Sequence, residues 1–157
     1  MPKIDLAAIP VRTGSGYPGG HAAKMNGRSQ QSLTGPGGLT QFGANIVTLA
    51  PGALSSLRHW HEQQDEFLVV IKGTCTLVDD TGKTPLAVGE CAAFPAGDPN
   101  GHHITNETDT DAQFVVVGTR TPTEVAHYSD VDMRVSVADG EFNFTRRDGT
   151  PFGDHPE

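Results

Sequence analysis

The sequence predicts an all-β fold, a sandwich or a barrel built from short strands. Nineteen glycines and eleven prolines cut the 157 residues into short pieces, and few windows longer than about ten residues keep a helical apolar period. The pieces are rich in Val, Ile, Phe, Leu and Thr, which favour strands. Between them, turn sequences such as 79–82 (Asp-Asp-Thr-Gly) and 96–99 (Ala-Gly-Asp-Pro) supply the fixed or positive φ angles that tight turns require. Short strands at such regular spacing indicate a sandwich or barrel.

Each expected strand is an apolar or β-branched run that ends at a turn signal. The expected strands are 43–49, 56–61, 66–72, 75–79, 84–88, 91–94, 102–106 and 112–118. Together they account for most of the middle of the chain.

The length suits one domain with a real core. We expect residues 1–40, rich in Gly, Ser, Gln and Pro, to form an N-terminal arm that packs on the barrel or on a partner subunit. Residues 41–120 form the barrel core. Residues 121–157 form a C-terminal extension, in which 142–144 (Phe-Asn-Phe) and the turn signal at 148–149 (Asp-Gly) predict a strand or hairpin.

The charge balance excludes several kinds of partner. Eleven basic against nineteen acidic residues give a formal charge of -8, which repels nucleic acid and anionic membrane surfaces. No apolar run has the length of a signal peptide or a membrane span, so a cytoplasmic location is expected. Cys75 and Cys91 are too few for a disulfide framework; two buried thiols are favoured over a bridge between them.

The sequence His59-Trp60-His61 has the pattern of half a metal site. Residues two apart on a strand point to the same face, so both imidazoles can reach one point in space. A carboxylate at Glu66 and a third imidazole at His102 would complete the set if the fold brought three strands together.

These residues belong to two blocks with regular spacing. The first block is Gly52, His59, His61, Glu66 and Gly73, and the second is Gly89, Pro95, Gly97, His102 and Asn106. This pair of blocks resembles the two signature motifs of the cupin superfamily, over residues 52–118. The resemblance implies a single-domain, RmlC-like jelly-roll β-barrel, in which His59, His61, Glu66 and His102 hold one divalent transition metal ion. The ion would be Fe, Mn, Ni, Co, Cu or Zn, since three imidazoles and a carboxylate suit all six.

The chain departs from the family pattern at two intervals. The interval from Gly52 to His59 is one residue longer, and the interval from Gly97 to His102 is two residues longer, which adds a loop at 98–101. The second departure leaves His102 and His103 adjacent. Counting back from Asn106 selects His102, and a strand would turn His103 to the opposite face.

Strand parity predicts what surrounds the ligands. Arg58 and Trp60 alternate with the two histidines and should point outward, and residues 62–65 should form a solvated turn. The inward positions are apolar: Leu57, Leu68, Val70 and Ile104. Such surroundings favour a small, partly hydrophobic organic ligand.

Several functions are compatible with this site. The first hypothesis is a small metal-dependent enzyme, a dioxygenase or lyase, that acts on a small oxygenated organic molecule. The alternatives are a sugar-phosphate isomerase-like enzyme and a non-catalytic small-molecule-binding cupin. Glu66 also has an alternative role as a general base beside the metal.

The isomerase ranks lower because a phosphate needs cations at the pocket. In the strands that carry the ligands the sequence offers only Arg58, which should point outward, and Lys72 at a strand end. Lys24, Arg28 or Arg120 could fold over the mouth of the barrel. The resemblance also implies a homodimer, with the N-terminal arm suited to strand exchange.

Overall fold

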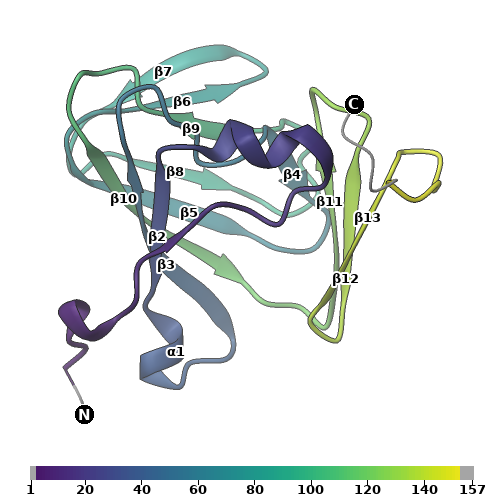
Figure 1. The fold of residues 1–157 in the computed structure, drawn as a ribbon, viewed down its shortest axis with the longest axis horizontal. Helices are drawn as coiled ribbons and strands as arrows, with labels where there is room; N and C mark the ends of the chain where they lie inside the picture. Colours follow the sequence, from purple (N-terminus) through teal and green to yellow (C-terminus); the bar gives the residue numbers. More distant parts are fainter. Residues whose placement is uncertain (1–2, 153–157) are drawn as a thin grey trace.

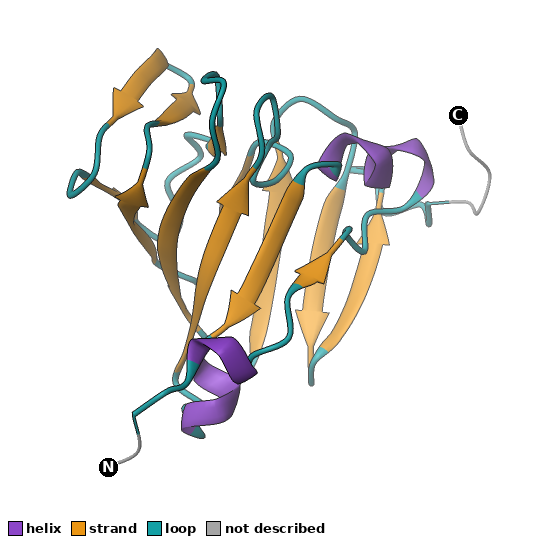
Figure 2. Cartoon of the chain, turned by 60° about the vertical axis from the view of Figure 1, so that its left-hand side comes forward, coloured by secondary structure: helices purple, strands orange, loops and turns teal. Residues whose placement is uncertain are grey.

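The chain folds into antiparallel sheets, and the predicted all-β jelly roll is confirmed. The computed structural model describes residues 3–152. Its largest sheet has six strands in the order β1-β2-β3-β10-β5-β8; a four-stranded sheet has the order β13-β12-β11-β4, and a three-stranded sheet the order β7-β6-β9 (Figures 1 and 2). Several neighbouring strands are far apart in the sequence: β3 pairs with β10, and β4 pairs with β11.

The strands in chain order are β1 Arg12–Thr13, β2 Arg28–Ser32, β3 Phe42–Leu49, β4 His59–His61, β5 Glu66–Lys72, β6 Cys75–Asp79, β7 Gly82–Leu86, β8 Cys91–Phe94, β9 His103–Thr105, β10 Ala112–Thr119, β11 Thr123–Tyr128, β12 Arg134–Ala138 and β13 Glu141–Thr145. The short helices are η1 Leu6–Ala8, η2 Gly19–Met25 and α1 Thr34–Gly37.

All eight expected strands are present, with shifted ends. The strand β7 begins at Gly82 and ends at Leu86, not at residues 84 and 88. The reason is that Asp79 pairs directly with Gly82 across a tight turn, while Glu90 closes the next turn by bonding Ala87 through both its backbone N–H and its carboxylate. Two strong turns therefore set the strand ends.

Both terminal segments contribute strands to the sheets. From the first 40 residues, β2 pairs with β3; from the last 37, β11 pairs with β4, and the predicted C-terminal hairpin is β12–β13. The start of the arm lies against β2, because the side-chain amide of Gln31 donates to the carbonyls of both Leu6 and Ile9. Ile9 is buried, whereas Leu6 is exposed.

The molecule has two apolar clusters. The larger one combines side chains of the six-stranded and three-stranded sheets and includes Leu68, Val70 and Ile104, all predicted to face inward. The second gathers Leu57 and Met25 with the inner face of β11 and β12. Met25 ends η2, which Figure 2 shows across the ends of the strands. The arm therefore covers the second cluster.

The two cysteines are separate thiols, one buried and one exposed. Cys75 is fully buried, and burial raises the pKa of its thiol to about 11. Cys91 is exposed, which corrects the expectation of two buried thiols: it begins the edge strand β8, with its side chain on the outer face. Within residues 3–152, no helix combines the length and apolarity that crossing a bilayer demands.

Candidate metal centre

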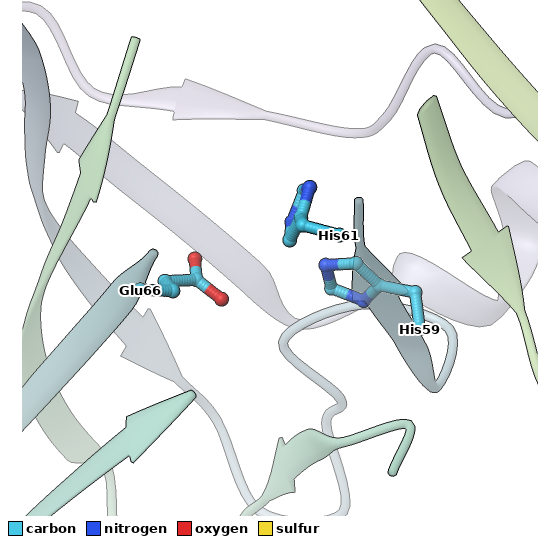
Figure 3. Close-up of side chains that lie close together, drawn as sticks. All are labelled: His59, His61 and Glu66. Atoms are coloured by element: carbon cyan, nitrogen blue, oxygen red, sulfur yellow. The ribbon is translucent and has the colours of Figure 1, made fainter. Parts of the chain in front are cut away.

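Three strand segments bring the predicted ligands together. On β4, His59 and His61 pair with Tyr128 and Ala126 of β11, which leaves both imidazoles on the inner face. Glu66 is the first residue of β5, and His102 forms a backbone bridge with His59 just before β9. Figure 3 shows His59 and His61, both on β4, directed toward Glu66 at the start of β5.

The donor atoms are close enough to share one ion. One donor atom each of His59, His61 and Glu66 lies within 4.8 Å of the other two. His102 stands next to this group, with its Nε2 at 2.9 Å from Oε2 of Glu66. Two ligands about 2.1 Å from a metal and at right angles to each other lie about 3.0 Å apart, so this spacing fits neighbouring ligands of one ion.

His102 is held more firmly than its neighbour in the chain. Its imidazole is buried and stacks face to face on the ring of Phe94, with the centroids 3.4 Å apart. His103 points the other way, with Nδ1 at 3.1 Å from the carbonyl oxygen of Ser56. The predicted opposite orientation of the two histidines is therefore present.

The electrostatics of the cluster favour the metal-binding protonation states. Burial, followed by the neighbouring His61, lowers the pKa of His59 to about 4, and burial also lowers the pKa of His61. For Glu66, burial acts to raise the pKa, but the hydrogen bond from His102 and the surrounding imidazoles outweigh it and lower the pKa. Neutral imidazoles beside an ionised carboxylate are the forms that bind metal.

His59 and His61 each have a ring nitrogen that could bind a metal ion. Nδ1 of His59 lies 2.9 Å from the carbonyl oxygen of Leu57, which leaves Nε2 for the cluster. Nδ1 of His61 is buried and makes no hydrogen bond within the described part of the chain. A buried polar atom without a partner is costly, and a cation would relieve that cost. The residues present therefore fit a divalent transition metal.

Glu124 holds the turn that follows His61, and it was not identified from the sequence. Its carboxylate is buried and accepts hydrogen bonds from the backbone N–H groups of Glu62, Gln63 and Val125. Its Oε1 also lies 3.9 Å from Nδ1 of His61. The turn between His61 and Glu66 is thus fixed by a carboxylate 60 residues further along the chain, although Glu62 and Gln63 are exposed as expected.

A cavity of about 1170 Å³ opens above the cluster. Its wall is largely apolar and includes Leu68 and Ile104, as parity predicts. A second cavity of about 320 Å³ reaches His61 and His102 between β4, β6 and β8. The cluster therefore lies between two spaces, and the larger one can accommodate an organic ligand.

Polar groups enter the larger cavity from outside the motif strands. Tyr17 of the N-terminal arm, Arg28 of β2 and Arg120 after β10 all line it. The sequence alone does not determine whether Arg28 or Arg120 lies over the mouth of the barrel, because neither residue belongs to a periodic pattern that fixes its direction. The pairing of β2 with β3 does settle the place of Arg28, opposite the inward-facing Leu49.

The outward assignments are confirmed. Arg58 forms ion pairs with Asp80 and Asp130 and does not line the larger cavity. Trp60 stacks on the ring of His127, with the centroids 4.3 Å apart. Neither side chain joins the predicted ligands.

Comparisons with known proteins agree with this fold and site. The family model described as a cupin domain matches residues 45–118. A crystal structure of a sugar phosphate isomerase of the cupin superfamily from Silicibacter pomeroyi is 58% identical, covers 97% of each chain, and has a TM-score of 0.95. A putative sugar phosphate isomerase from Acidithiobacillus ferrooxidans is 26% identical over 80% of each chain, with a TM-score of 0.73.

A more distant likeness concerns the fold alone. The polyketide cyclase from Streptomyces resistomycificus is 20% identical over 76% of this chain and 79% of its own, with a TM-score of 0.63. A search of curated proteins found no match. The family model and the 58% identity over nearly the whole chain agree with the two motif blocks and their converging side chains: the chain belongs to the cupin superfamily.

Proposed function

We propose that this protein is a metal-dependent isomerase that acts on a phosphorylated sugar. The observation that carries the proposal is the cluster of three imidazoles and one carboxylate on the wall of a cavity large enough for such a substrate. The reaction class is supported by the 58% identity to the Silicibacter pomeroyi sugar phosphate isomerase.

Isomerisation of a sugar needs no oxidant, because a proton leaves the carbon beside the carbonyl and another returns to the adjacent carbon. A divalent metal, when bound by His59, His61, Glu66 and His102, would polarise the carbonyl oxygen. Glu66 is the ionised carboxylate in the cluster, so its alternative role as proton acceptor stays open. The other carboxylate near the cluster, Glu124, already accepts hydrogen bonds from backbone N–H groups with both of its oxygens.

The test combines metal content with solvent exchange. Protein purified without chelators is expected to carry about one transition metal per chain by elemental analysis. With a panel of pentose and hexose phosphates in D₂O, NMR should show product together with deuterium at the carbon beside the carbonyl. Chelator treatment and His61→Ala should abolish both signals. Metal-loaded wild type that converts no member of the panel would contradict the proposal.

A dioxygenase or lyase is the second candidate, ranked first from the sequence. The apolar wall of the cavity favours it, since Phe114, Val116 and Val135 surround the space with hydrocarbon. Oxygen uptake with small oxygenated aromatic or aliphatic acids, absent with sugar phosphates, would support the dioxygenase. A co-purified small molecule that survives incubation with metal and oxygen would instead support the non-catalytic binding protein.

A further inference from the structure

Arg28 is a half-buried cation on the inner face of the six-stranded sheet. On β2, Arg28 and Gln30 pair with Leu49 and Val47 of β3, whose side chains are buried, so both polar side chains face the inside of the molecule. Cross-strand partners share a face of the sheet. The guanidinium therefore lies on the same side as the apolar core.

The contacts of Arg28 leave much of its hydrogen-bonding capacity unused. Its Nη2 donates to Oε1 of Gln30 at 2.6 Å, whereas its Nε is buried and has no hydrogen-bond partner in the described part of the chain. Within residues 3–152 no carboxylate forms an ion pair with it. Keeping an unpaired charge away from water is costly, and burial accordingly lowers the pKa of Arg28.

Arg28 shares its cavity with the predicted metal ligands. Tyr17 lines the same space, and its ring meets those of Tyr128 and Phe144 edge to face. Tyr128 in turn lies beside His59, with the ring centroids 5.9 Å apart. The arm thus brings a phenol into the cavity that Arg28 and the histidine cluster share.

We propose that Arg28, with Gln30 and Tyr17, forms the subsite that binds the phosphoryl group of the substrate. A guanidinium fork matches the oxygens of a phosphate, and an anion would provide the partner that Nε lacks. The sugar would then extend from this subsite toward His59 and Glu66. The proposal rests on the proposed function for its choice of phosphate over other oxygen anions.

The test begins with binding, independent of activity and metal. Inorganic phosphate should raise the thermal unfolding temperature of chelator-treated full-length protein, relative to chloride at equal ionic strength. In Arg28→Met the affinity for phosphate should fall by about 10-fold or more. The variant should unfold at the same temperature as wild type or higher without phosphate, because it removes a half-buried charge that no carboxylate within residues 3–152 pairs with.

Arg120→Met is the matched control, since Arg120 lines the same cavity but is exposed. Its affinity for phosphate should change less than about twofold. An equal loss in both variants would overturn the assignment to Arg28, because it would reflect the general field of the cavity. Unchanged affinity in Arg28→Met would overturn it directly.

Three ligands separate the source of the anion. An aldose phosphate should protect the wild type in an Arg28-dependent manner, and the neutral aldose should not. Arg28-dependent protection by the aldonic acid but not by the phosphate would overturn the phosphoryl assignment. Phosphate binding at Arg28 without isomerisation would refute the proposed function alone, whereas isomerisation with unchanged kinetics in Arg28→Met would refute this subsite alone.

Discussion

At the scale of single residues, adjacent histidines have opposite surroundings. His102 lies inside, stacked on Phe94 and bonded to Glu66, and His103 lies outside against the Ser56 carbonyl. The difference arises from strand geometry, which turns successive side chains to opposite faces. A substitution of His103 can therefore serve as the control for the same substitution of His102.

His102→Ala should weaken metal binding more than about 100-fold, beyond the 10–100-fold typical of residues that only support a ligand. His103→Ala should leave metal affinity within about twofold of wild type, because its side chain does not face the cluster. Competition with a coloured chelator measures both affinities. Equal losses in the two variants would refute the assignment of His102.

At the scale of elements, the turn between β4 and β5 sets the distance between ligands. It joins His61 to Glu66, and its N–H groups converge on the buried carboxylate of Glu124 at the start of β11. A short turn fixed at one point limits how far the two ligands can separate. Glu124 thus acts on the cluster by positioning it.

Glu124→Gln should lower metal affinity about 10–100-fold, because an amide offers one acceptor oxygen and places an NH₂ group against backbone donors. Glu62→Gln, at an exposed position in the same turn, is the matched control and should bind metal as wild type does. Chelator competition gives the affinities, and thermal unfolding of the metal-free variants reports any general loss of stability. Wild-type metal affinity in Glu124→Gln would contradict the positioning role.

At the scale of the whole molecule, the outer face of the six-stranded sheet has exposed apolar side chains. On β5, Phe67 is 43% and Ile71 42% exposed, and Phe67 pairs with Val117 of β10 on the same face. Exposed apolar side chains that gather on one face are typical of a surface that packs against another protein. We propose that this face forms the predicted homodimer interface.

Light scattering at micromolar concentration should give the mass of a dimer. Phe67→Glu should shift it to that of a monomer, because a charge would be buried in the interface. Val88→Glu, at an exposed apolar residue in the turn after β7, should remain dimeric. A monomeric wild type would refute the homodimer.

The sequence by itself determined the local pattern of this protein. Turn residues and β-branched runs gave the eight central strands, and period-two parity gave the inner and outer faces on β4, where Arg58 and Trp60 do point away from the cluster. The His-x-His spacing indicated His59 and His61, and the resemblance to the cupin motifs implied Glu66 and His102 as the other ligands. The faces of β4 depend on residues close in the chain, and strand geometry decides them.

Only the tertiary structure decided which distant groups meet at the site. The pairing of β2 with β3 placed Arg28 in the cavity, and β11 brought Glu124 beneath the turn after His61. Both positions depend on strand pairings between segments far apart in sequence, where a one-residue change of register would turn each side chain to the opposite face. For this reason the sequence indicated a metal site, whereas the arginine that lines the same cavity was found only from the fold.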